Sequence, residues 1–178
     1  CLVGSEMCIR DSKNINYADV NYCPLRYADV VLMAAEAYNE TGTDRQKAWD
    51  LLNSVRTRAE ATSITEANYD EMMSARKKTH NLTFIDDSTP EGKFRTALYW
   101  ERGFELAFEG QRKYDLIRWG VLGKALKLFG EISSVNQKEN KPYPAYRNFT
   151  EGKHELFPIP LKEIQSNPKL NGMNNNGY

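Results

Sequence analysis

Hydrophobic residues recur every three or four positions through most of the chain, which is the spacing of one face of an α-helix. After Pro24 the apolar residues keep this spacing as far as Gly42, which predicts a first helix that ends at the glycine. Residues 43–61 repeat the pattern and begin with Thr43 and Asp44, either of which can cap a second helix. Two amphipathic helices joined by a short turn predict an antiparallel helical hairpin.

The middle of the chain continues the helical pattern. Ser63 and Glu66 have the spacing of a capping box ahead of a short third helix. Thr89 followed by Pro90 predicts the start of a fourth helix, which we expect Gly110 to interrupt. Two further short helices are predicted in the segments QRKYDLIRW, residues 111–119, and VLGKALKLF, residues 121–129.

The ends of the chain and one internal segment depart from this pattern. Residues 133–146 are rich in Asn, Lys, Pro and Tyr, a composition typical of a loop. The C-terminal segment contains Pro158, Pro160 and Pro168, which exclude a long helix and predict an extended tail with at most one helical turn. The sequence therefore predicts a mostly all-α fold with irregular loops, preceded by a leader at residues 1–16 that has no periodicity.

Composition and charge narrow the classes of function. The chain has 178 residues, of which 40% are hydrophobic, and its formal net charge is zero with 24 basic and 24 acidic side chains. This balance gives no support to a nucleic-acid partner, which requires a basic surface. The cysteines show no C-x-x-C spacing, and His80 and His154 stand far apart, so we expect no metal and no cofactor. No apolar run is long enough to span a membrane.

The segment ALYWERGFELAFEGQRKYDLIRWG, residues 97–120, places three glutamates at helical spacing among aromatic side chains. An unpaired carboxylate on a buried helix is costly, so these glutamates need cationic partners. The nearest candidates are Arg102, three residues before Glu105, and the arginines beyond Gly110. We interpret the segment as a structural ion-pair network. Its expected members are Glu101, Arg102, Glu105, Glu109, Arg112, Asp115 and Arg118.

A catalytic interpretation of the same segment stays open, in which Glu101 and Glu105 are the carboxylate pair of a glycoside hydrolase. One helical turn places their Cβ atoms about 5 to 6 Å apart, which is compatible with the roughly 5 to 5.5 Å between the carboxyl groups of a retaining enzyme. A general acid must keep its proton, however, and neighbouring arginines favour the ionised form of a carboxylic acid. The structural interpretation is therefore preferred, and we expect no catalytic residues.

Aromatic side chains are candidates for stacking on a sugar ring. The candidate ligand contacts, on or near the predicted loop, are Trp119, Tyr143 and Tyr146. Trp100, Phe104 and Phe108 instead share one face of the fourth helix, and we expect them in the core.

Four segments of the sequence, in their order and spacing, resemble the C-terminal part of the SusD/RagB family. They are LRYADVVLMAAEAYNETG, AWDLLNSVRTRA, ALYWERGFELAFEGQRKYDLIRWG and HELFPIPLKEIQSNPKLNGMNNNGY. The resemblance covers residues 17–178, which it identifies as the C-terminal helical domain of that family. It implies tetratricopeptide-like helix hairpins, in agreement with the hairpin that the hydrophobic pattern predicts.

The resemblance also implies a function. Family members are non-enzymatic lipoproteins on the surface of the Gram-negative outer membrane that bind glycans or other nutrients and pass them to a TonB-dependent, SusC-like transporter. They are several times longer than this chain, and the resemblance implies that membrane attachment is only through a lipid anchor absent from this sequence, so Cys1 is not expected to be lipidated. The alternatives are the glycoside hydrolase and a generic helical-repeat interaction module.

Removal of residues 1–12 is predicted to leave the fold intact, because this segment follows no periodicity and stands outside the resemblance. The melting temperature of the shortened chain should stay within a few degrees of the full chain, which corresponds to roughly 1 kcal/mol for a domain of this size. A larger decrease in the melting temperature would show that the segment is part of the folded structure.

Overall fold

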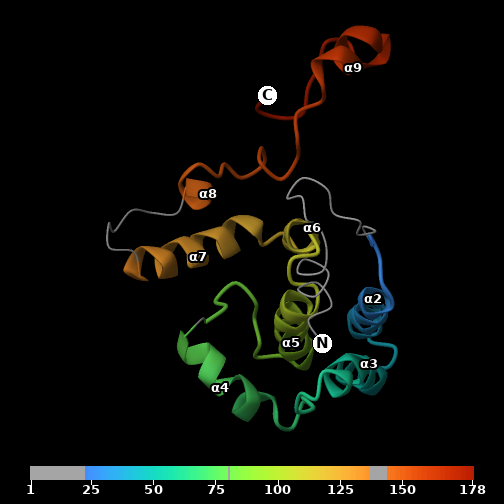
Figure 1. Ribbon diagram of the computed structural model, residues 1–178, viewed down its shortest axis with the longest axis vertical. Coiled ribbons are helices and arrows are strands. Elements are labelled where there is room, and N and C mark those ends of the chain that lie inside the picture. Colours follow the sequence, from blue (N-terminus) through green and yellow to red (C-terminus); the bar gives the residue numbers. More distant parts are fainter. Residues whose placement is uncertain (1–22, 80, 137–143) are drawn as a thin grey trace, which may run out of the picture. The chain divides into compact units, whose positions relative to one another are not determined.

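The computed structural model describes residues 23–79, 81–136 and 144–178, and every regular element in these ranges is helical. The all-α prediction is therefore confirmed. The chain divides into two compact units, Cys1–Arg112 and Lys113–Tyr178. The helices, labelled in Figure 1 where there is room, are α2 (Tyr27–Thr41), α3 (Arg45–Arg58), α4 (Tyr69–Thr79), α5 (Pro90–Glu105), α6 (Arg112–Arg118), α7 (Leu122–Asn136), α8 (Pro144–Arg147), α9 (Leu161–Ser166) and the 3-10 turn η1 (Pro168–Leu170).

Helices α2 and α3 form the predicted hairpin in the first unit and lie side by side in Figure 1. Gly42 ends α2 in the left-handed conformation, with φ of 64°, which residues with a Cβ atom adopt only at a cost. Asp44 caps α3, because its carboxylate accepts a hydrogen bond from the backbone N–H of Lys47 at 2.8 Å. Both local signals in the sequence thus fix the turn of the hairpin.

Helix α5 packs against both helices of the hairpin and completes the core of the first unit. It begins as predicted, with Pro90 in its first turn and Thr89 accepting a hydrogen bond from the N–H of Gly92 at 3.1 Å. The ring of Trp49 meets that of Phe94 edge to face, with centroids 4.9 Å apart. The other large buried side chains of this core include Leu32, Leu52, Tyr69, Met73 and Leu98.

The fourth helix is shorter than predicted, and the expectation for two of its aromatic residues is wrong. Helix α5 ends at Glu105, and the chain turns where Leu106 enters the core. Phe104 is exposed, and Phe108 is fully exposed in a left-handed conformation with φ of 66°. The exposed Phe104 ring stacks on the half-buried ring of Trp100, with centroids 5.9 Å apart. Neither phenylalanine therefore belongs to the core.

The start of α4 also differs from the prediction. The helix begins at Tyr69, and its lead-in is a reciprocal pair between Thr65 and Asn68 rather than a capping box of Ser63 and Glu66. The N–H of Thr65 donates to Oδ1 of Asn68 at 2.7 Å, and the N–H of Asn68 donates to Oγ1 of Thr65 at 3.3 Å. Later in the chain, α7 is longer than predicted and ends inside the expected loop, and the tail holds α9 and η1 rather than a single turn.

In the second unit, two glycines of α7 allow aromatic rings to approach its backbone. Gly123 and Gly130 are seven residues apart, which places them on one face of the helix. A Cβ atom added to Gly123 would lie 2.8 Å from Cε1 of Phe149, and one added to Gly130 would lie 2.8 Å from Cδ1 of Tyr146. Both rings therefore rest on the helix at positions where a larger residue would displace them.

Gly92→Ala is predicted to destabilise the first unit. A Cβ atom at residue 92 would lie 1.6 Å from the backbone oxygen of Asp86, so α5 or the preceding loop must move, at a cost of about 1 to 3 kcal/mol or more. Gly103→Ala in the same helix is the matched control, because its Cβ would lie at an ordinary 3.4 Å from Cζ of Arg112. The control should gain up to about 1 kcal/mol from helix propensity. Equal free energies of unfolding in urea for both variants would disprove the tight contact.

Candidate functional site

The first candidate site is the set of carboxylates around the end of α5, which lies in the first unit. Glu101 is buried, and its Oε2 accepts a hydrogen bond from Nη1 of Arg56 in α3 at 2.5 Å. Arg56 also donates from Nε to the backbone oxygen of Thr62 at 2.8 Å. The two charges are therefore buried together and compensate each other, which is the condition for a tolerated buried ion pair.

Arg26 and Arg58 bind the other two glutamates. Nε of Arg26, just before α2, donates to both carboxylate oxygens of Glu109 at 2.8 and 2.9 Å, and its Nη1 donates to Glu105 at 2.5 Å. Arg58, the last residue of α3, binds the same oxygen of Glu105. The hydrogen bond to Glu109 raises the pKa of the Arg26 guanidinium. These contacts fasten the end of α5 and the following turn to both helices of the hairpin.

Arg102, which was expected to pair with Glu105 from within the same helix, binds an aspartate of α2. Nη1 of Arg102 donates to Oδ1 of Asp29 in α2 at 2.7 Å, and both side chains are buried. The arginines that bind the glutamates are instead between 45 and 83 positions away in the sequence. The partners predicted from local spacing were therefore wrong for Glu105, because the pairing depends on how the helices pack.

The remaining predicted members of the network lie elsewhere. Nη1 of Arg112 donates to the backbone oxygen of Tyr99 at 2.8 Å, and its Cζ lies 3.9 Å from the centroid of the Tyr99 ring. Nη2 of Arg118 donates to Oδ1 of Asp115 at 3.0 Å within α6, at the one-turn spacing that the sequence suggested. Within the described part of the chain, the contacts of the seven residues thus form several groups, which centre on α3 with α5, α2 with α5, and α6.

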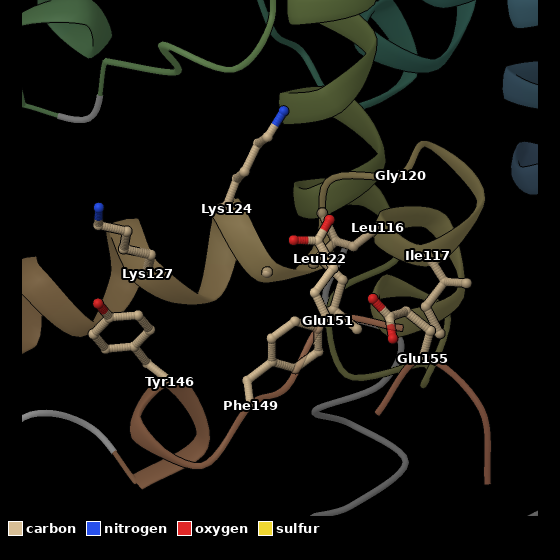
Figure 2. Close-up of a pocket in the computed structure, with 11 residues that line it drawn as sticks. Leu116, Ile117, Gly120, Leu122, Lys124, Lys127, Tyr146, Phe149, Glu151 and Glu155 are labelled. Atoms are coloured by element: carbon tan, nitrogen blue, oxygen red, sulfur yellow. The ribbon is translucent and has the colours of Figure 1, made fainter. Parts of the chain in front are cut away.

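The second candidate site is a pocket of about 360 Å³ in the second unit, which we call the α7 pocket (Figure 2). Its apolar lining comes from Leu116, Ile117, Leu122 and the rings of Tyr146 and Phe149. Its charged lining comes from Lys124, Lys127, Glu151 and Glu155. The pocket therefore combines aromatic and aliphatic surface with a few charged groups, as small-molecule sites commonly do.

The charged groups of the α7 pocket are not equivalent. Oε2 of Glu155 is buried and has no hydrogen-bond partner. Figure 2 shows the carboxylates of Glu151 and Glu155 beside Leu122 and Ile117, while the ammonium groups of Lys124 and Lys127 point away from these carboxylates. The two carboxylates therefore lie on the side of the pocket that Leu122 and Ile117 line.

The aromatic candidates from the sequence have three different outcomes. Tyr146 is half-buried and lines the α7 pocket. Trp119 is half-buried next to the pocket-lining Gly120, and Cζ of Arg118 lies 5.1 Å from its ring centroid. Tyr143 lies outside the described residues.

Sequence reasoning missed Phe149 and Glu155, which also line the α7 pocket. The seven-residue spacing of Gly123 and Gly130 was the one signal that could have indicated a helix face on which rings rest. Among the described side chains, no group of three His, Cys, Asp or Glu residues is placed to hold a metal ion. Within the same part of the chain, no helix has the length and apolar character needed to cross a membrane.

Known proteins are similar to this chain in sequence and in fold. The model of the SusD family matches residues 7–178, so the match begins inside the leader set apart at residues 1–16. SusD-like protein P25 of Formosa agariphila is 36% identical over 172 residues, which are 96% of this chain and 27% of that protein. SusD-like protein P2 of the same organism is 34% identical over 161 residues, or 90% of this chain and 26% of that protein.

A solved structure gives the same result. The crystal structure of a SusD homolog from Bacteroides thetaiotaomicron matches with a TM-score of 0.65 and 33% identity, over 90% of this chain and 28% of that one. The chain thus spans about a quarter of the length of these relatives.

Glu101→Ala is predicted to lower the free energy of unfolding by roughly 3 to 5 kcal/mol, because it leaves the buried guanidinium of Arg56 uncompensated. Glu91→Ala is the control, since Glu91 and Arg45 form an ion pair whose side chains are 39% and 34% exposed, and such pairs contribute about 1 kcal/mol or less. Urea denaturation measures both values. Similar losses in the two variants would contradict a structural role for the buried pair.

Proposed function

Because the chain belongs to the SusD family, we propose that it is part of a cell-surface protein that binds a glycan or other nutrient without hydrolysing it. On this proposal the whole protein is a lipoprotein of the Gram-negative outer membrane. It delivers its ligand to a TonB-dependent, SusC-like transporter. Family membership supports each of these steps, and the α7 pocket is the single structural observation that carries the proposal of ligand binding by this part of the protein.

The α7 pocket suits a sugar in its size and in the nature of its lining. Its volume of about 360 Å³ falls within the range of roughly 300 to 1,000 Å³ that is typical of ligand sites. The C–H face of a sugar ring packs against an aromatic ring. Phe149 and Tyr146 offer such rings, which rest against Gly123 and Gly130 of α7. Sugar hydroxyl groups can donate hydrogen bonds to the carboxylates of Glu151 and Glu155.

The contacts of Glu101 and Glu105 support binding rather than hydrolysis. A retaining glycosidase needs one carboxylic acid that gives up a proton and one carboxylate free to attack the sugar. Glu101 instead accepts a hydrogen bond from Arg56 in a buried pair, and Glu105 is shared by two arginines. Both carboxylates are therefore engaged in holding helices together.

A helical-repeat interaction module is the second candidate, and one observation favours it. Phe108 is fully exposed and is held in a left-handed conformation that is uncommon for a bulky residue. A strained residue at a surface often marks a functional contact, and an exposed phenylalanine suits an apolar protein partner.

Weak binding of neutral oligosaccharides is the expected result when the isotope-labelled chain is titrated and followed by NMR. The amide signals of residues 116–123 and 146–155 should shift, and Phe149→Ala should abolish the shifts because it removes the ring beneath the sugar. Trp119→Ala is the matched aromatic control and should bind as the unmodified chain does. Chromogenic glycosides should release no dye.

Two outcomes would contradict the proposal. Dye release that is lost in Glu101→Gln would favour the glycoside hydrolase. Shifts that persist in Phe149→Ala and disappear in Trp119→Ala would show that the ligand binds outside the α7 pocket.

A further inference from the structure

We infer that the α7 pocket selects saccharides that carry a free, positively charged amino group over neutral and anionic ones. The inference rests on the proposed function and names the ligand class of the same site. It follows from the unpaired carboxylates of the pocket, their apolar surroundings and the direction of the lysines.

Glu155 lines an open pocket, yet its Oε2 is buried and has no hydrogen-bond partner. A buried acceptor without a donor destabilises a protein, and the effect is larger for a charged group. A ligand that brings a donor to this oxygen would therefore gain the hydrogen bond that the protein alone does not form.

Glu151 and Glu155 take part in none of the ion pairs among the described residues, so no salt bridge within that part of the chain neutralises the two carboxylates that line the pocket. Figure 2 shows the ammonium groups of Lys124 and Lys127 extending away from them. A protonated amine can donate up to three hydrogen bonds and bring the compensating charge at the same time.

The apolar part of the lining lies beside these carboxylates. Leu116, Ile117 and Leu122 supply it, and surroundings less polar than bulk water strengthen the attraction between opposite charges. The ring of Phe149 adds a face that attracts cations. An anionic sugar, such as a uronate, would instead meet two like charges there, while a neutral sugar would gain hydrogen bonds without charge.

The test compares three oligosaccharides of equal length in NMR titrations of the full chain at about pH 6, where an amino group is protonated. The probes are a glucosamine oligomer with free amines, its N-acetylated counterpart and a galacturonate oligomer. We expect the dissociation constant of the free-amine oligomer to be about tenfold lower than that of the N-acetylated one, as one charge-assisted hydrogen bond provides. The galacturonate oligomer should bind more weakly than both.

Two variants connect the preference to the carboxylates. Glu155→Gln keeps the shape of the side chain and should reduce the preference for the free amine, taken as the ratio of the two dissociation constants within that variant, to about twofold or less. Glu66→Gln, at an exposed residue of the first unit, is the matched control and should keep the full preference. If the amide spectrum shows that Glu155→Gln alters the fold, Glu151→Gln tests the same charge from an exposed position.

The outcomes separate this inference from the proposed function. Equal or tighter binding of the N-acetylated oligomer would overturn the inference and leave sugar binding intact. A preference that is unchanged in both Glu155→Gln and Glu151→Gln would also overturn it. Absence of binding by all three oligomers would overturn the inference together with the α7 pocket as a sugar site.

Discussion

The buried pair of Arg56 and Glu101 is the interaction on which the first unit depends. It joins α3 to α5 across a core that is otherwise mostly apolar. A second buried pair, Arg102 with Asp29, joins α5 to α2. A hydrophobic contact tolerates small shifts between helices, but a buried guanidinium must keep its carboxylate within hydrogen-bond distance. The two ion pairs therefore hold α5 against the hairpin and also fix the position of α5 along the hairpin.

The same residue type has two different roles because its surroundings differ. Glu101 accepts a hydrogen bond from an arginine that is itself held by the backbone oxygen of Thr62, so its charge is used within the fold. Glu155 has a buried oxygen without a partner beside an apolar lining, and on our proposal its charge serves a ligand. The sequence draws attention to the first glutamate because it lies in a conspicuous cluster, while the second stands alone in an irregular segment.

Features that depend on neighbouring residues could be predicted from the sequence. Gly42, Asp44 and the Thr89–Pro90 pair act through backbone conformation and capping, which are decided within one helical turn. The arginine partners of the glutamates could not be predicted, because they are brought close by the packing of α2, α3 and α5. Helical periodicity likewise identifies an apolar face without saying what covers it, which is why the exposed positions of Phe104 and Phe108 were not foreseen. The sequence predicts Tyr146 in a loop, whereas it lies in α8, and its neighbours in the pocket depend on how α8 packs against α7.

A double-mutant cycle on Arg56 and Glu101 tests most directly whether the conspicuous glutamates hold the structure together. Arg56→Met and Glu101→Leu should each destabilise the chain strongly in urea denaturation. The double variant should be more stable than the sum of the two losses predicts, with a coupling energy of about 1 to 3 kcal/mol, because no charge is then left buried alone. If the two losses in free energy of unfolding simply add, the two charges do not compensate each other in the folded chain, and the buried pair does not hold α3 to α5.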